Sequence, residues 1–479
     1  MPPAPPAPLT KPNAAAFHFH AYSYPGDTAN GPFALSGGLA SANNWQFYSL
    51  VEDLNGLVAW GNHIGVPNIS LTAMSSVPGG ALTSDARETL VLSLGPALGV
   101  LDAPSVVITG GIHAREWIAS ELAYLVAEYL VLHYSTAPLS PYQKMIKYLV
   151  DHRQIFIIPM LNPDGNDTTV FANRLWRKNR RWLPITPAGW TNLLTGNGTL
   201  GADPPPFRNV RVPPAPPAPP AAPAPPAPPA EYSVPIYNVG NGVPLAAAAR
   251  YTQQLADYEI GIDLNRNLPT RAWGYDGLYF GVVPAVTTGA SNPASETYFG
   301  PSAGSEQETA NVRIALANAD AAAWTGITAA IDYHSRGKFI LFPTEAADYG
   351  QVDRDYAFLG RALHQLVHTQ NVLDYQLGTP RQLLHGDAPG TLIDYEAQVY
   401  QTRAFVIELD PDQASPWRWL LPEGQICAVF EKNIRGALAA LTTAGVPTNR
   451  DSDMYYRQLT RLFLAWAVFN RGNRLPQWP

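Results

Sequence analysis

The sequence has little cysteine, little charge and no long apolar run, and each shortage excludes a class of protein. A single cysteine, Cys427, excludes an intramolecular disulfide framework and any zinc site built from several thiolates. Charged residues make up 14% of the 479 residues, well below the roughly 25% of a typical soluble domain. The net charge of −7 argues against a general nucleic-acid binder, which would carry an excess of basic residues.

The first residues, MPPAPPAPLTK, lack the basic start and the apolar segment of a secretory signal. No uninterrupted apolar run reaches the length of about 18 residues that a membrane-spanning helix needs. The sequence therefore predicts a soluble, cytoplasmic protein without a membrane partner.

Proline is abundant, at 47 residues, and its distribution suggests the domain boundaries. Residues 1–35 are rich in Pro, Ala and Gly and are expected to form an extended arm. A Pro-rich insertion at about 183–247 should adopt polyproline II, because proline cannot donate a backbone hydrogen bond. Residues 448–479 carry apolar side chains at helical spacing and are expected to form a helical extension. One large domain, 36–447, remains.

Within this domain, strand-like and helix-like patterns alternate. Short apolar runs typical of strands occur at 89–94, 105–109, 154–160, 326–333, 338–342 and 404–409. Apolar residues at helical spacing occur at 43–62, 117–133, 306–323 and 356–370. Alternation of this kind predicts an α/β fold with a mixed central β-sheet flanked by helices.

The strongest local signal is GGIHAREWIAS at 110–120, between a predicted strand and a predicted helix. His113 and Glu116 are three residues apart at this junction, and imidazole and carboxylate are good zinc ligands. A catalytic zinc also needs a third protein ligand and an open position. The spacing alone arises by chance in a chain with 10 His and 38 acidic residues, so a surface histidine beside a helical glutamate remains the alternative.

Further segments, in the same order along the chain, resemble the zinc metallocarboxypeptidases of the carboxypeptidase A/B type, peptidase family M14. The segments are GIHAREW at 111–117, NPDGND at 162–167, NRLWRKNRR at 173–181, GIDLNRN at 261–267, SNPASETYFGPSAGSE at 291–306, IDYHS at 331–335, FVIEL at 405–409 and WRWLLPEGQI at 417–426. The resemblance covers about residues 40–445 and implies a zinc carboxypeptidase-like fold.

The resemblance implies one Zn²⁺ per chain, bound by His113, Glu116 and His334, with the fourth position left to water. It implies that Glu408 is the general base that takes the proton from this water. Asp263 is implied as the partner of His113 that fixes the tautomer of the imidazole.

Other matched residues are implied to bind the substrate. Arg177 would stabilise the developing oxyanion, although the basic cluster around it could instead bind nucleic acid, which the acidic chain argues against. Asn265 and Arg266 would bind a free terminal carboxylate, which separates an exopeptidase from an endopeptidase. Arg115 would contact carbonyl groups on the upstream side of the substrate.

The loop 378–395 departs from the family, which has a mobile tyrosine there. His385 stands at or beside that position and can donate a hydrogen bond. Counting back from Glu408 places Ile393 at the end of the specificity pocket, which predicts a preference for aromatic or large aliphatic terminal residues. A shift of one residue would place Asp394 there and would select Lys or Arg instead.

Together these residues predict a zinc-dependent metallocarboxypeptidase that hydrolyses the C-terminal peptide bond. Its substrates would be peptides or N-acyl amino acids with a free C-terminal carboxylate, and no nucleic acid or membrane would be a partner. Two alternatives remain: a hydrolase of N-acyl amino acids or small amides that uses the same site, and a non-catalytic binding protein with this fold. The presence of all three expected ligands and of Glu408 argues against the second alternative.

Overall fold

A computed structural model of the chain shows how these segments fold. The structure describes residues 47–97, 103–138, 141–171, 175–181, 261–271, 273, 286–287, 295–343, 375–384, 386–410, 419 and 426–444. The expected arm, Pro-rich insertion and C-terminal extension, the expected helix at 356–370 and His385 lie outside these residues.

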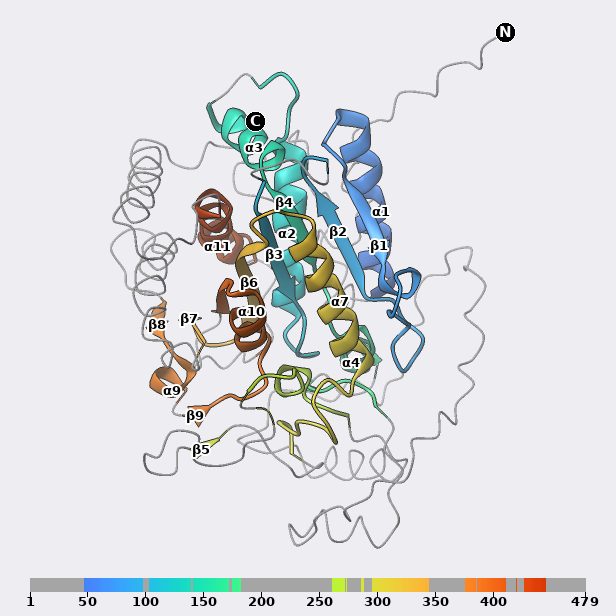
Figure 1. The fold of residues 1–479 in the computed structure, drawn as a ribbon, viewed down its shortest axis with the longest axis vertical. Coiled ribbons are helices and arrows are strands. Elements are labelled where there is room, and N and C mark those ends of the chain that lie inside the picture. The colour runs from blue at the N-terminus through green and yellow to red at the C-terminus, as the bar shows by residue number, and fades with distance from the viewer. Residues whose placement is uncertain are drawn as a thin grey trace, which may run out of the picture.

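A mixed sheet forms the centre of the molecule (Figure 1). Its order is β1-β2-β4-β3-β6-β10-β7-β8. The strands are β1 Ser70–Ala73, β2 Leu90–Leu94, β3 Ser105–Gly110, β4 Gln154–Ile158, β6 Ile327–Ser335, β7 Phe339–Leu341, β8 Gln376–Gly378 and β10 Arg403–Leu409. A second, two-stranded sheet pairs β5 (Val286–Thr287) with β9 (Gly386–Asp387).

The middle of the sheet is parallel and its flanks contain antiparallel pairs. β4, β3, β6 and β10 run parallel to one another, whereas β1 and β2, β2 and β4, and β7 and β10 pair antiparallel. Every residue of β3 and β6 is buried, as expected for parallel strands covered on both faces. The carboxyl ends of the parallel strands therefore meet at one edge of the sheet, where ligands bind in such folds.

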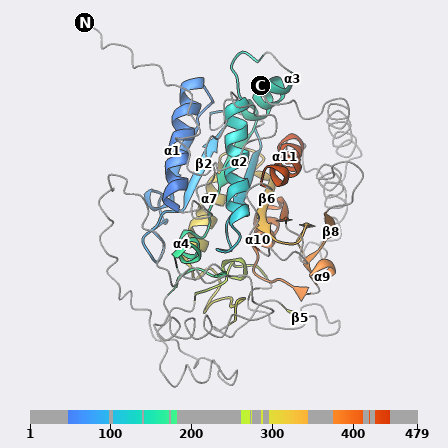
Figure 2. The ribbon, with the colours of Figure 1, turned by 180° about the vertical axis from the view of Figure 1, so that it is seen from behind.

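Helices cover both faces of the sheet (Figures 1 and 2). One face packs against α1 Phe47–Ile64, α2 Trp117–His133, α3 Pro141–Asp151 and α11 Ile426–Thr443. The other face packs against α7 Gln307–Ala321 and α10 Leu392–Tyr400. Shorter helical segments are Met74–Ser76 (η2), Pro163–Phe171 (α4), Leu264–Arg266 (η5) and Pro380–Leu383 (α9). A burial of apolar residues this extensive supplies the main favourable term of folding.

The alternation of side chains along β6 decides which residues can form a site. Ile331 and Tyr333 join the core beneath α2 and α11, whereas Ala330 joins the core beneath α7 and α10. Because side chains alternate between the faces of a strand, Asp332 and His334 lie on the same face as Ala330. Both polar residues are fully buried, so they require partners on that face.

The predicted α/β fold with a mixed central sheet is confirmed, and the strand ends have local causes. The predicted strand at 154–160 ends at Ile158, because Pro159 has no N–H for the ladder. The predicted strand at 326–333 extends to Ser335, because its last residues pair with β10 through Ser335 and Leu409. This extension carries His334 to the carboxyl edge of the sheet.

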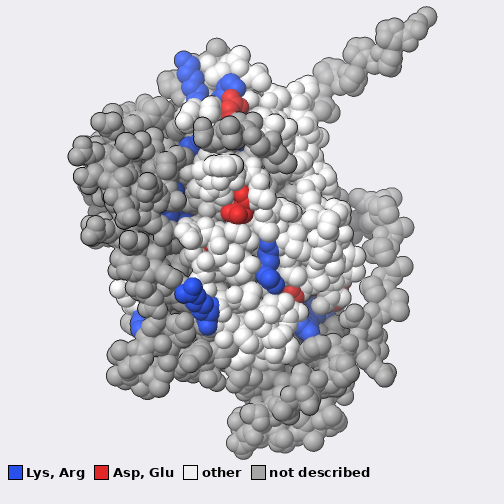
Figure 3. All heavy atoms as spheres, viewed as in Figure 1, with Lys and Arg blue, Asp and Glu red and all other residues white. Residues whose placement is uncertain are grey.

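Among the described residues, no helix is both long and apolar enough to cross a bilayer. Among the described residues on the face seen in Figure 3, basic and acidic groups are scattered among uncharged atoms and form no continuous patch of one sign.

Candidate metal centre

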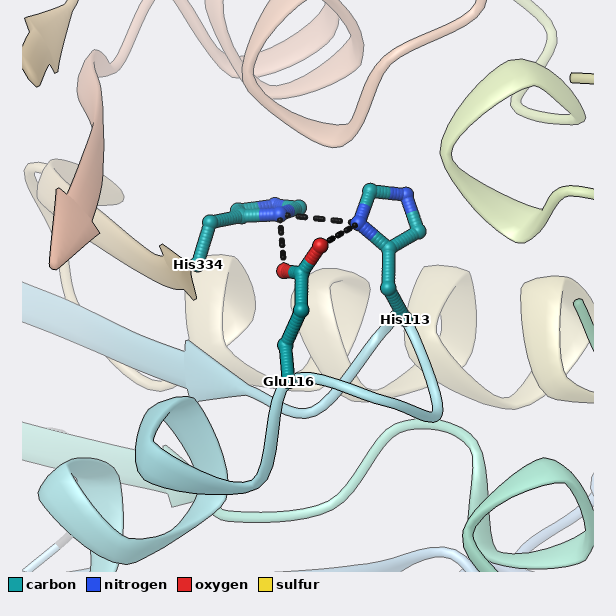
Figure 4. Close-up of side chains that lie close together, drawn as sticks. All are labelled: His113, Glu116 and His334. Carbon is teal, nitrogen blue, oxygen red and sulfur yellow. Dashed lines mark hydrogen bonds and ion pairs between the residues drawn. The ribbon is translucent and has the colours of Figure 1, made fainter. Parts of the chain in front are cut away.

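Three buried side chains from distant parts of the sequence meet beyond the carboxyl edge of the sheet (Figure 4). His113 and Glu116 lie in the turn between β3 and α2, and His334 lies near the end of β6. The turn depends on Gly111, whose φ of +68° is readily adopted only without a Cβ. A Cβ at Gly111 would also collide with the hydroxyl of Ser120.

The three side chains present one electron-rich atom or group each. His113 Nδ1 lies 2.9 Å from Glu116 Oε1, and His334 Nδ1 lies 3.0 Å from Glu116 Oε2. The two Nδ1 atoms lie 3.1 Å apart. All the ligand atoms lie within 4.8 Å of one another, and the backbone N–H of Ser335 donates to Glu116 Oε2 at 3.1 Å. This spacing fits three ligands of one small cation.

The opposite ring nitrogens each face a buried carboxylate. His113 Nε2 lies 3.2 Å from Asp263 Oδ1, and His334 Nε2 lies 2.8 Å from Asp332 Oδ2. With a metal on the Nδ1 side, the hydrogen of each ring would lie on Nε2, facing a carboxylate, which can only accept. In that form each Nδ1 presents a lone pair to the metal, with a carboxylate behind the ring.

Two imidazole lone pairs and a carboxylate that face one another in a buried space repel unless a cation lies between them. Two imidazoles and one carboxylate form a donor set that suits Zn²⁺ and leaves one coordination position open. The residues present therefore fit the metal that the sequence implies. Within the described part of the chain, no other cluster of His, Cys, Asp or Glu meets this geometry.

The pKa values of Glu116 and His334 reflect the same requirement for positive charge. Burial alone would raise the pKa of Glu116, but the two imidazoles outweigh it and hold that pKa far below its usual value. Burial would lower the pKa of His334, but the carboxylates of Asp332 and Glu116 raise it well above the usual value. A bound cation supplies the charge that these groups otherwise take from a proton.

Glu408 stands beside this centre on the neighbouring strand. It is opposite His334 in the parallel ladder between β10 and β6, on the sheet face that also holds Val406. Its carboxylate makes no hydrogen bond to any described residue. Burial is the main reason that its pKa rises to about 8, and the charge of Glu116 adds to this effect. Glu408 is therefore a carboxylate whose proton affinity depends strongly on nearby cations.

Arg177 lies next to Glu116 and is oriented by Asp263. Its Nε and Nη2 donate to Asp263 Oδ2 at 3.0 and 2.9 Å, while its Nη1 lies 4.0 Å from Glu116 Oε1. Burial opposes its charge, yet the carboxylates of Asp263 and Glu116 raise the pKa of the guanidinium. Arg177 is a fixed cation at the edge of the metal position.

Asn265 and Arg266 follow Asp263 in a short 3-10 helix that begins with a side-chain cap. Asp263 Oδ1 accepts from the backbone N–H of Asn265 at 3.0 Å. The side chain of Asn265 accepts from the N–H of Leu392 at 2.8 Å, so its amide nitrogen points the other way, 3.3 Å from His334 Nε2. Burial lowers the pKa of Arg266 to about 10, which leaves it a cation at neutral pH.

Arg115 makes its contacts outside the three converging side chains. Its Nη1 lies 3.0 Å from the Glu296 carboxylate and donates to the carbonyl of Leu175 at 3.2 Å. Its guanidinium stacks 3.8 Å from the ring centre of Trp419, which also lies 5.0 Å from Arg336. Two arginines and a tryptophan thus line one side of the site, next to the loops that carry the metal triad.

The residues expected at the specificity pocket begin α10. Ile393 is buried in the core beneath α7 and α10. Asp394 is also buried, and its carboxylate accepts from the hydroxyl of Thr391 at 2.6 Å in the first turn of the helix. Ile393 and Asp394 are adjacent in the sequence. In the structure, Ile393 packs in the apolar core, whereas the carboxylate of Asp394 is hydrogen-bonded in the first turn of α10.

Sequence reasoning missed three residues that shape this site. Asp332 stands two residues before His334 in IDYHS, and the two-residue period of a strand was the available signal. Asn162 donates to the carbonyls of Ile112 and Lys178, which holds the metal-binding turn against the segment that carries Arg177. The segment NPDGND begins at Asn162, but its sequence alone does not predict this contact.

Asn179 is the third missed residue. Its amide accepts from the N–H of Ile262 at 2.7 Å and donates to Glu306 at 2.8 Å and Glu308 at 3.2 Å. The segment with Arg177 is thereby joined to the segment with Asp263. These contacts hold the guanidinium and its carboxylate partner in register.

Comparison with known proteins agrees with this geometry. The family model described as zinc carboxypeptidase matches residues 81–203 and 240–436, which together are more than half of the chain. The chain is 25% identical over 422 residues to "Metallocarboxypeptidase A" of Trichophyton tonsurans, covering 85% of this chain and 74% of the relative. A shorter match, 34% identical over 130 residues, covers 26% of this chain and 21% of "Inactive metallocarboxypeptidase ECM14" of Paracoccidioides brasiliensis.

Solved structures show the same fold. Carboxypeptidase A from Helicoverpa armigera superposes with a TM-score of 0.52 at 19% identity, covering 84% of this chain and 73% of that chain. Bovine thrombin-activatable fibrinolysis inhibitor, solved with a tick carboxypeptidase inhibitor, superposes with a TM-score of 0.50 at 19% identity, covering 83% of this chain and 96% of that chain. With the family model matched over most of the domain, the chain belongs to the zinc carboxypeptidase family of peptide hydrolases.

Proposed function

We propose that this protein is a carboxypeptidase of the A/B type that removes single residues from the C-terminus of peptides. The observation that carries the proposal is the position of Asn265 and Arg266 next to the triad of His113, Glu116 and His334. An amide donor and a buried cation at that place suit a free terminal carboxylate. An internal peptide segment has no such group to offer.

The three triad residues are proposed to bind one Zn²⁺, which supplies Lewis-acid polarisation of a water and of the scissile carbonyl. Glu408 is proposed to take the proton of the attacking water and to deliver it to the nitrogen of the leaving residue. Its partly buried carboxylate, without a hydrogen bond to any described residue, supports this role. A metal dication beside it favours the ionised form that a base requires.

Arg177 is proposed to stabilise negative charge on the carbonyl oxygen as it develops. The two contacts to Asp263 hold the guanidinium in place before the reaction, and a preorganised cation in a buried site stabilises a transition state without further reorganisation. Arg115 is proposed to contact the upstream part of the peptide, from the side of the site that it shares with Trp419.

The terminal residue is proposed to be aromatic or large and aliphatic. Ile393 packs in an apolar core, and the carboxylate of the adjacent Asp394 is hydrogen-bonded within its own helix start. A pocket that ends on a buried apolar side chain favours an apolar group over a cation, because an unpaired buried ammonium is costly.

The test is a series of blocked dipeptides ending in Phe, Leu, Lys, Arg or Glu, assayed with and without a chelator. We expect chelator-sensitive hydrolysis of the Phe and Leu substrates. The same dipeptides with an amidated C-terminus should not be cleaved, because the carboxylate that binds Asn265 and Arg266 is missing. Cleavage of the amides at an equal rate, or cleavage of the Lys and Arg substrates alone, would overturn the proposed recognition.

Adding acetyl-Phe and a longer acyl-Phe to this series separates the alternatives. A hydrolase of N-acyl amino acids would cleave these two compounds faster than the dipeptides. A non-catalytic protein would bind zinc and the terminal carboxylate but cleave none of these substrates. This outcome is included because one relative is named an inactive metallocarboxypeptidase. The complete set of triad residues together with Glu408 supports the catalytic proposal.

A further inference from the structure

A tryptophan at the rim of the metal centre lies against two arginine side chains. The guanidinium of Arg115 lies 3.8 Å from the ring centre of Trp419, and that of Arg336 lies 5.0 Å from it. Arg115 lies two residues after the ligand His113. Arg336 lies two residues after the ligand His334. Both arginines therefore extend from the chain segments that hold the triad, and they form a platform with Trp419 beside the metal position.

The backbone around Arg336 is held on both sides. The N–H of Ser335 donates to Glu116 Oε2 at 3.1 Å, and the N–H of Gly337 donates to the carbonyl of Leu409 at 3.1 Å. Leu409 is the last residue of β10. Because both neighbours of Arg336 are bonded to the site or to the strand beside it, the position of Arg336 is set relative to the metal ligands.

Arg115 is held by a neighbouring loop and by an acidic side chain. Its Nη1 donates to the carbonyl of Leu175 at 3.2 Å and to the carboxylate of Glu296 at 3.0 Å. The side chain of Arg115 is 7% exposed, whereas that of Glu296 is 61% exposed. Glu296 thus reaches the guanidinium from the solvent side, and it shows the kind of group that this arginine binds.

The platform of Arg115, Arg336 and Trp419 presents N–H groups that suit a carboxylate. A guanidinium over an indole turns its face to the ring, while its N–H groups point outward in its own plane. These groups match the two oxygens of a carboxylate. An acidic side chain that reached the platform would meet two cations, one of which already binds a carboxylate of the chain itself. The chemistry therefore favours an acidic side chain over an amide of the same shape.

We propose that Arg115, Arg336 and Trp419 form a subsite for an acidic side chain of the substrate, upstream of the scissile bond. The enzyme then prefers peptides with Glu or Asp in that part over peptides with the corresponding amides. This subsite rests on the proposed function, because it needs a peptide that extends from the metal towards Arg115. Arg336 and Trp419 become residues that determine specificity, together with the pocket for the terminal residue.

The substrates for the test are blocked tetrapeptides that end in Ala-Phe and carry Glu, Gln or Lys at one of the two preceding positions. Gln keeps the shape and the carbonyl group of Glu but has no charge. At one of these positions, we expect a wild-type kcat/KM about 5- to 20-fold higher for Glu than for Gln. The value for Lys should be lower still, and high salt should reduce the preference for Glu.

Two wild-type results are distinguished by these substrates. Equal kcat/KM values for Glu and Gln at both positions, in a protein that cleaves the peptides, would overturn the subsite alone. No cleavage of any peptide by the zinc-loaded protein would contradict the proposed function, on which the subsite depends. If the dipeptide series selects another terminal residue, that residue replaces Phe in all the tetrapeptides.

Arg336→Gln removes one charge from the platform, and Lys338→Gln is the matched control. Lys338 lies in the same turn but pairs with Asp410 at 3.3 Å, so its replacement changes the net charge equally. We expect the preference for Glu over Gln to fall to about twofold or less in Arg336→Gln and to stay at the wild-type ratio in Lys338→Gln. An unchanged preference in Arg336→Gln, or an equal loss in both variants, would overturn the proposal.

Glu296→Gln should act in the opposite direction. It removes the carboxylate that contacts Arg115, so the acidic side chain of the substrate no longer competes with it, and we expect the preference for Glu to rise above the wild-type ratio. Thermal melting shows whether each variant folds. A ratio at or below that of the wild type in folded Glu296→Gln would overturn the proposal, and this result does not depend on the folding of Arg336→Gln.

Discussion

Two buried polar clusters flank the segment that carries Arg177, and they differ in how their acceptors are satisfied. In the metal centre, two imidazole Nδ1 atoms and the carboxylate of Glu116 face one another at the distances that suit ligands of one cation. In the cluster around Asn179, donors reach both carboxylates: the amide of Asn179 donates to Glu306 and Glu308, and Arg181 pairs with Glu306.

The difference shows why buried acids alone do not indicate a metal site. Acceptors that have donors, or that take up a proton, form a closed structural network. In the Asn179 cluster, Glu306 and Glu308 both have donors. Glu308 can also take up a proton, because burial and the charges of Asp164 and Glu306 raise its pKa to about 8. Acceptors that face one another without a donor require a cation. The following predictions test this distinction.

The largest effect is expected at the metal triad. His334→Ala removes one of three ligands, so we expect the protein to lose bound zinc and its peptidase activity to fall to background. Metal analysis of the purified protein and hydrolysis of a Phe-terminal dipeptide measure both. His63→Ala, at the exposed end of α1, is the control and should retain both. Full activity in His334→Ala would mean that the centre is not catalytic.

Glu408→Gln should separate metal binding from chemistry. The amide cannot accept the proton of the attacking water, so we expect kcat to fall about 10²- to 10⁴-fold, while zinc content and KM change little. Steady-state kinetics on zinc-loaded protein measure this. A loss of zinc equal to that in His334→Ala would place Glu408 among the ligands instead.

Arg177→Met should lower kcat by about 10²- to 10³-fold, because it removes a preorganised charge aimed at the transition state. Arg180→Met is the matched control in the same segment, where Arg180 pairs with Asp85 away from the triad. The two variants are compared by kcat/KM at saturating zinc. Equal kinetics in the two would show that Arg177 supports structure only.

The smallest effect is expected in the closed cluster. The pKa of Glu308 is raised in the folded state, so its contribution to stability is fully present below the unfolded pKa of about 4.3 and is lost as the pH rises through about 8. Glu308→Gln removes this titration, so its melting temperature should fall less than that of the wild type between about pH 5 and pH 9. Parallel curves for the two proteins would contradict a neutral, buried Glu308.

The sequence predicts the parts of this architecture that local pattern determines. Apolar runs located the central strands, and GGIHAREWIAS located the turn between β3 and α2 because its glycines permit the backbone to reverse there. Strand periodicity was sufficient to place His334 at the end of a buried strand. These features depend on neighbours in the chain.

The remaining features depend on contacts between distant segments. The amide of Asn265 is oriented by the N–H of Leu392, 127 residues away. Asp332 lies within a recognised motif, but its partner Thr109 comes from another strand, 223 residues away. Asn179, Ile262 and Glu306 each lie in a matched segment, but no segment predicts their pairing, because the turns that carry them meet only in the folded chain. Such pairs follow from sheet order and register.

The central claim is that the two Nδ1 atoms of His113 and His334 and the carboxylate of Glu116 bind a single zinc ion. Crystals of the zinc-loaded protein, with anomalous diffraction collected on both sides of the zinc absorption edge, test it directly. We expect one anomalous peak about 2.0–2.2 Å from His113 Nδ1, His334 Nδ1 and a Glu116 oxygen, with Asp263 and Asp332 on the opposite ring nitrogens. A peak bound through either Nε2, or zinc bound elsewhere while these three side chains remain in contact with one another, would contradict the account.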